Sequence, residues 1–174
     1  MKWLSEDFKN LRSLWVNQLR VLLSAEEQIV RALPDMITHA NDEQLRQAFQ
    51  AHLQESEVHV KRLEQILAEH RHAHADAGTT APTKCKVLTA LKAETEDMMV
   101  DARDAWVRDA ALIAVAQRVE HYEIASYGTV RQWATLLGET AAAELLDKTA
   151  QEEGHADQLL TSIAERVNSR ALAA

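Results

Sequence analysis

The chain has few of the residues that interrupt helices, with 4 Gly and 2 Pro among 174 residues. These two residue types are the most destabilising in a helix interior. Hydrophobic residues make up 47% of the chain, so the composition argues against a disordered protein. Ala, Leu, Glu and Gln are frequent and favour helices. We therefore expect an all-α protein with enough chain for one domain and its core.

Cysteine is rare, long apolar runs are missing, and we expect no signal peptide. With Cys85 as the single cysteine, no intramolecular disulfide is possible, which fits a reducing compartment. The start of the sequence turns acidic at once, unlike a signal peptide, and no run approaches the roughly 18 apolar residues of a membrane span. The formal net charge of -8 argues against nucleic-acid binding, which needs a basic surface. We expect a cytoplasmic protein that binds neither nucleic acid nor membrane.

Apolar residues recur at intervals of three and four along most of the chain, as on one face of a helix. Ser5 and Thr140 are candidate N-caps, Gly138 suits the position just after a helix, and Pro34 is expected to kink the first helix. Residues 70–82 have the composition of a loop. The pattern predicts helices over about residues 5–40, 42–69, 83–101, 106–137 and 141–168.

Four of these helices are long and the third along the chain is shorter. The first two are expected to form one hairpin and the last two another, with the short helix in the connection between the hairpins. One long crossover between two hairpins is the ferritin-like variant of the four-helix bundle. The sequence therefore predicts a single ferritin-like domain over residues 1–174.

A weak internal repeat supports two matching hairpins. A shift of 97 residues superimposes glutamates and core apolar residues of the two halves. The superimposed pairs are Glu26 with Glu123, Glu55 with Glu152, Leu63 with Leu160 and Ile66 with Ile163.

Acidic and imidazole side chains interrupt the apolar stripe of each long helix near its middle. Buried carboxylates are costly unless they are paired, protonated or bound to a cation. Carboxylates from four helices, together with Glu-x-x-His, are the ligand pattern of di-metal four-helix bundles. The candidate metal ligands are Glu26, His52, Glu55, Glu120, Glu123, Glu152, Glu153 and His155.

Some of these assignments carry alternatives. Helical spacing and the repeat favour Glu152, with His155 three residues later, but the adjacent Glu153 is also a candidate. His52 and His59 are either ligands, partners of ligands or ordinary histidines at the edge of the core. Mixed carboxylate and imidazole ligation suits Fe or Mn better than Zn or Cu(I). We expect two such ions per chain, which could react with peroxide or O₂.

Four strings carry a resemblance to a known family. They are Ser-Ala-Glu-Glu-Gln at 24–28, His-Leu-Gln-Glu-Ser at 52–56, Glu-His-Tyr-Glu-Ile-Ala-Ser-Tyr-Gly-Thr at 120–129 and Gln-Glu-Glu at 151–153. With these strings the chain resembles the YciE/YciF-like ferritin-like stress proteins, which are related to rubrerythrins. The resemblance covers nearly the whole chain, and its third string is the most specific.

The resemblance implies a bundle that is usually a homodimer and takes part in bacterial stress responses, without a defined reaction. The positions that match the family pattern are Glu26, His52, Glu55, Glu120, Glu123 and either Glu152 or Glu153, whereas His59 and His155 look peculiar to this chain. The resulting hypothesis is a stress protein whose metal ions handle an oxidant and are re-reduced by an unknown electron donor. The alternative is a non-enzymatic bundle with a vestigial site that works through dimerisation or partner binding.

Overall fold

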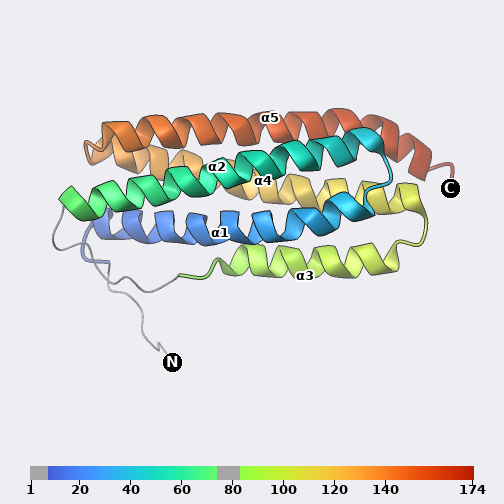
Figure 1. The fold of residues 1–174 in the computed structure, drawn as a ribbon, viewed down its shortest axis with the longest axis horizontal. Coiled ribbons are helices and arrows are strands. Elements are labelled where there is room, and N and C mark those ends of the chain that lie inside the picture. Colours follow the sequence, from blue (N-terminus) through green and yellow to red (C-terminus); the bar gives the residue numbers. More distant parts are fainter. Residues whose placement is uncertain (1–7, 74–82) are drawn as a thin grey trace, which may run out of the picture.

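A computed structural model describes residues 8–73 and 83–174, and its regular elements are all α-helices (Figure 1). This agrees with the all-α class expected from the composition. The helices are α1 (Leu11–His39), α2 (Glu43–Ala73), α3 (Lys86–Asp101), α4 (Ala105–Leu136) and α5 (Thr140–Ala171).

The four long helices form two antiparallel hairpins, α1 with α2 and α4 with α5 (Figure 1). The hairpins pack through α1 against α4 and through α2 against α5, while α3 lies along the outside against α1 and α4. The chain crosses the length of the bundle between the hairpins, so α2 and α4 run in the same direction (Figure 1). The predicted ferritin-like connectivity is confirmed.

The helix ends differ from the expected ones where a different residue supplies the cap. Residues 8–10 are not helical, so α1 begins at Leu11 rather than near residue 5, and Ser5 lies outside the described residues. The Asn10 side chain accepts a hydrogen bond of 2.9 Å from the Ser13 amide and so caps the helix. Thr140 is the first residue of α5 instead of its cap. Gly138 has a φ of 77°, as expected for the residue that ends α4.

Helix α2 continues to Ala73, past the predicted end near residue 69. His70 lies inside this extension, where its buried ring meets the edge of Trp15 with 5.5 Å between ring centroids. This contact stabilises four further residues of helix, which the loop-like composition of this segment did not predict. The rest of the predicted loop, residues 74–82, lies outside the described residues. Pro34 lies within α1, which continues to His39, and the kink expected there stays a prediction.

The interior contains two separate apolar clusters, one toward each end of the bundle. The first surrounds Ile29, Leu33 and Phe49. The second surrounds Trp15, Leu63 and other large side chains. None of the described helices is apolar enough over a sufficient length to cross a membrane.

Candidate metal centre

A layer of buried polar side chains separates the two apolar clusters at mid-length, and all four long helices contribute to it. In α1, Glu26 lies one turn after Leu22 and one turn before Ile29, so all three side chains point into the bundle. The other helices interrupt their apolar stripes in the same way. The buried members of the layer are Glu26 from α1, His52, Ser56 and His59 from α2, Glu120 and Glu123 from α4, and Glu153 from α5.

Among the described residues, two groups in this layer could hold a metal ion. One consists of Glu26, His59 and Glu153, and the other of His52, Glu120, Glu123 and Glu153; within each group the ligand atoms all lie within 4.8 Å of one another. Both groups include Glu153. A carboxylate has two oxygens, so one glutamate shared by two groups can bridge two ions.

His59 has both ring nitrogens directed at carboxylates. Its Nδ1 lies 3.2 Å from Glu26 Oε1 and 3.0 Å from Glu153 Oε1, and its Nε2 lies 3.0 Å from Glu152 Oε2. Glu152 is itself held by Arg62, which donates to both of its oxygens and, over 2.9 Å, to the Thr149 hydroxyl. An imidazole that donates one N–H to a carboxylate and turns the other nitrogen to the metal is the usual arrangement around metal-bound histidines.

Tyr127 closes the layer on the side of the second apolar cluster. Tyr127 is 1% exposed, and its hydroxyl donates a 2.5 Å hydrogen bond to Glu26 Oε1. Its ring meets the edge of His59 with 6.4 Å between centroids. The tyrosine thus packs in the core and also orients one carboxylate of the layer.

Burial and crowding shift the proton equilibria of the layer in a consistent direction. Burial, followed by the charges of neighbouring carboxylates, raises the pKa of Glu120 and of Glu123 well above its ordinary value. Burial also raises the pKa of Glu26. Burial alone would lower the pKa of His59, but the close carboxylates of Glu153 and Glu26 raise it to about 10. The layer therefore holds protons more readily than the same groups do in water.

Many polar atoms of the layer have no hydrogen-bond partner among the described residues. They include both oxygens of Glu123 and of Glu153, Oε2 of Glu26 and of Glu120, and Nδ1 of His59. Buried polar groups are almost always satisfied in native proteins, and exceptions call for a bound ion or water. These unsatisfied atoms are carboxylate oxygens and imidazole nitrogens, which are the ligands that Fe and Mn accept. The residues present therefore fit a metal centre.

The layer departs from the ligand pattern of di-metal four-helix bundles in two positions. That pattern has single glutamates on two helices and Glu-x-x-His on the other two. Glu26 and Glu123 are the single glutamates here, but α2 has Ser56 before His59 and α5 has Ala156 after Glu153. His52 lies one turn before Ser56 on α2, and Glu120 lies one turn before Glu123 on α4. His52 Nε2 and Glu120 Oε1 are 3.4 Å apart. These two residues add a histidine and a glutamate to the layer.

The structure places the predicted ligands in two sets. Glu26, His52, Glu120, Glu123 and Glu153 lie together in the buried layer. Of the two alternatives on α5, Glu153 is the interior residue, while Glu152 is half-buried and contacts His59 from outside.

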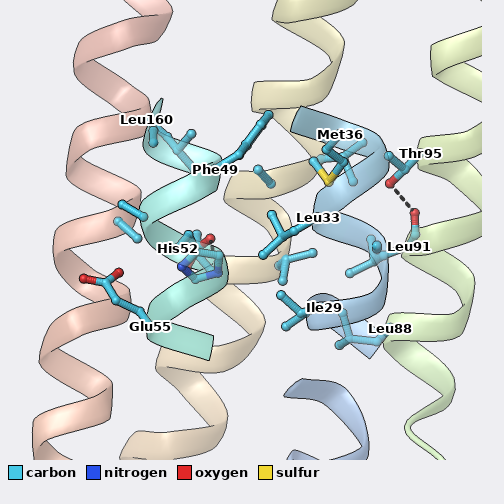
Figure 2. A pocket seen from close by; sticks show the side chains of 18 of the residues that line it. Ile29, Leu33, Met36, Phe49, His52, Glu55, Leu88, Leu91, Thr95 and Leu160 are labelled. Atoms are coloured by element: carbon cyan, nitrogen blue, oxygen red, sulfur yellow. Dashed lines mark hydrogen bonds and ion pairs between the residues drawn. The ribbon is translucent and has the colours of Figure 1, made fainter. Parts of the chain in front are cut away.

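The expectation that Glu55 and His155 point into the bundle is wrong, because both are exposed. The Glu55 side chain points away from His52 (Figure 2). Successive helical residues are turned by about 100°, so an error of one position exchanges an interior side chain for an exposed one. The residues that face inward at this level are Ser56 and His59 on α2 and Glu153 and Ala156 on α5. The shift of 97 residues therefore pairs Ser56 with Glu153, one position after the predicted pair of Glu55 and Glu152.

A signal for this correct face is present in the sequence. Leu63 and Leu160 are buried, and a residue seven positions earlier, two turns back, lies on the same face of its helix. Counting back seven positions reaches Ser56 and Glu153. Ser56 is not an expected metal ligand, so the sequence does not single it out. Arg62, which holds Glu152, is marked in the sequence only by its position on the neighbouring face of α2.

Comparisons with known proteins agree with this architecture. Residues 10–173 match the family described as Domain of unknown function (DUF892). Protein YciF of Escherichia coli (strain K12) is 37% identical over 166 residues, which are 95% of this chain and 97% of that protein.

Two solved structures are similar over nearly their full lengths. The crystal structure of the E. coli stress protein YciF has a TM-score of 0.85 at 36% sequence identity, and the match covers 93% of this chain and 99% of that chain. YcfI from Rhodopseudomonas palustris, described provisionally as a structural protein, has a TM-score of 0.82 at 33% identity, with 91% and 98% covered. The resemblance seen in the four sequence strings is therefore confirmed, and the chain belongs to the DUF892 family as a YciF-like stress protein.

Proposed function

We propose that this bundle binds two Fe or Mn ions per chain in its polar layer and uses them to react with peroxide or O₂ under stress. The observation that carries the proposal is that two groups of ligand atoms, drawn from four helices, share Glu153. Glu26, His59 and Glu153 would hold one ion, and His52, Glu120, Glu123 and Glu153 the other.

The distances within the first group support this assignment. Neighbouring ligands of a small six-coordinate ion, each about 2.1 Å from it, lie about 3 Å apart. His59 Nδ1 lies 3.2 Å from Glu26 Oε1 and 3.0 Å from Glu153 Oε1. Little movement of these side chains is needed for an ion to enter between them.

Bound Fe or Mn would supply redox chemistry, and the surrounding residues would prepare the site for it. Arg62 and Glu152 keep the His59 ring turned so that Nδ1 faces the carboxylates. Tyr127 holds Glu26 in place from the apolar side and keeps a hydroxyl proton close to the layer. The flanking apolar clusters border the layer at both ends. The electrons for re-reduction would come from a donor outside the chain, and we propose a homodimer in the cytoplasm as the working form.

The test is peroxide consumption by protein loaded with Fe(II) or Mn(II) and freed of excess metal. We expect turnover with one of the two metals and none in Glu153→Gln, because that variant loses the shared ligand. Glu55→Gln removes a carboxylate from the exposed face of α2 and is the matched control that should keep turnover. A loaded wild type that leaves peroxide and O₂ untouched would contradict the oxidant role.

The second candidate function is a non-enzymatic bundle with a vestigial centre. It is favoured by Ser56 and Ala156, which stand where di-metal bundles have a glutamate and a histidine, and by the provisional structural label of YcfI. This candidate predicts a protein that takes up no Fe or Mn and whose glutamates titrate as a coupled, partly protonated cluster.

A further inference from the structure

An apolar cavity lies beside the polar layer, inside the first apolar cluster (Figure 2). It has a volume of about 160 Å³. Its walls come from all five helices and are mostly aliphatic, and they include Ile29, Leu33, Phe49, Leu88 and Leu160. A well-packed core of this size would not leave such a volume unfilled, since interiors are packed as densely as organic crystals.

One part of the cavity wall is polar and buried. His52 is 7% exposed and Glu120 is 2% exposed, and both line the cavity. Both ring nitrogens of His52 and Oε2 of Glu120 have no hydrogen-bond partner among the described residues. Two buried side chains with free donors and acceptors at one end of an apolar cavity are the features that orient a small ligand.

We propose that this cavity binds a small uncharged organic molecule, about the size of one six-membered ring, that carries a single hydroxyl or carbonyl group. The size follows from the volume, because an apolar protein cavity of about 150 Å³ accepts benzene. The apolar walls select an uncharged body, since burying an unpaired charge among them is costly. His52 and Glu120 select the one polar group, which gives a hydrogen bond to atoms that otherwise lack one.

The exposed residues at the border of the cavity show where the ligand enters. Glu55 and His155 line the cavity and are exposed, one on α2 and the other on α5. Leu159 of α5, which is 48% exposed, also lines the cavity. The seam between α2 and α5 therefore connects the cavity to solvent. This gives Glu55 and His155 a place at the mouth of a binding site rather than in the metal centre.

The proposal goes beyond the metal centre, because the cavity is shaped by side chains that are not candidate ligands, although it shares His52 and Glu120 with that centre. Binding is therefore measured on metal-free protein in the presence of a chelator. Failure to take up Fe or Mn would leave this proposal standing, and failure to bind an organic molecule would leave the proposed metal centre standing.

The probes are phenol, toluene and benzoate, titrated into the ¹⁵N-labelled protein and followed by NMR and by calorimetry. We expect phenol to bind once per chain, with shifts confined to the cavity residues. Toluene should bind roughly tenfold more weakly because it cannot hydrogen-bond to His52 or Glu120. Benzoate should not bind, because its charge would be buried next to carboxylates.

Ala116→Leu fills the cavity from α4, where Ala116 is buried against it, and should abolish phenol binding. Ala156→Leu fills it from a half-buried position on α5 and serves if the first variant does not fold. Ala125→Leu makes the same change on the exposed face of α4 and should bind phenol like the wild type. The proposal is overturned if the wild type does not bind phenol, or if folded filling variants bind it unchanged.

Discussion

Glu152 is the residue at which ligand and supporting roles can be separated by experiment. It contacts Nε2 of His59 and is held by Arg62, while the neighbouring Glu153 faces Nδ1. Carboxylates that orient a metal-bound histidine typically contribute 10–100-fold to metal affinity.

Glu152→Ala is therefore expected to weaken metal binding by roughly 10–100-fold while two ions per chain still bind at saturation. Titration calorimetry with Mn(II) measures both quantities. Gln151→Ala, on the exposed side of the same turn, should leave both unchanged. A variant that binds only one ion would show that Glu152 is a ligand, and unchanged affinity would show that His59 needs no support from it.

The protonation of the layer makes the stability of the metal-free protein depend on pH. His59 has a pKa of about 10 in the folded protein and an ordinary value of 6.5, and burial raises the pKa of Glu120 and of Glu123. The folded state thus binds more protons than the unfolded state between about pH 5 and 10. Where this is so, the free energy of unfolding falls as pH rises.

We expect the melting temperature of the metal-free protein, followed by circular dichroism, to fall steadily from pH 5 to pH 9. His59→Gln removes the contribution above pH 6.5 and should flatten that part of the curve. A melting temperature that rises over this range would contradict the arrangement of buried carboxylates around His59.

At the scale of the helical element, Asp42 stabilises the turn between α1 and α2 in two ways, by capping α2 and by binding Arg166. Asp42 Oδ1 accepts from the amides of Gln44 and Leu45, which caps α2, and both of its oxygens accept from Arg166 of α5 at 2.7 and 2.8 Å. Burial alone would raise the pKa of Asp42, but the Leu45 amide, Arg166 and the Gln44 amide together lower it.

Asp42→Ala should lower the free energy of unfolding by about 2–3 kcal/mol, because both a cap and a charged hydrogen bond are lost. Asp104 caps α4 from an exposed position through the amides of Trp106 and Val107. Asp104→Ala is the matched comparison and should cost about 1 kcal/mol. Equal losses in urea denaturation of the two variants would show that Arg166 adds nothing to the cap.

The elements also show how far sequence reasoning reaches. The periodic apolar pattern was sufficient to predict five helices, their order and the crossover, because these depend on many residues at once. The interior residue at one turn depends on a rotation of about 100°. Sequence alone points to Glu55 and the structure to Ser56, because a carboxylate is an expected metal ligand and a serine is not.

The helix ends were predicted less well for a related reason. An end depends on one local hydrogen bond or contact, such as the Asn10 cap of α1 or the packing of His70 on Trp15 in α2. Several candidate caps lie near each end, and the sequence does not rank them. The long-range partners of the site, such as Arg62 with Glu152, depend on how α2 and α5 pack.

At the scale of the whole molecule, the two hairpins meet in a layer that stability alone does not favour. Its carboxylates are buried, with polar atoms left unpaired. A cation that binds the folded state and not the unfolded one stabilises the fold by mass action, by about 2.7 kcal/mol per site at 100 times the dissociation constant.

We therefore expect saturating Mn(II) to raise the melting temperature of the metal-free protein by at least ~5 °C, as measured by calorimetry. Mg(II) at the same concentration should have a smaller effect, because imidazole suits Mn and Fe better than Mg. Glu153→Gln should show little shift with either ion. Equal shifts in the wild type and in this variant would indicate binding elsewhere on the acidic surface.

The central claim is that Glu153 joins two ion sites in the polar layer, and the most direct test is metal content per chain by elemental analysis. The protein is expressed with Fe and Mn both supplied and purified without a chelator. The account predicts about two ions in the wild type and in Glu55→Gln, and fewer than one in Glu153→Gln. A wild type without metal, or a Glu153→Gln variant that retains both ions, would contradict it.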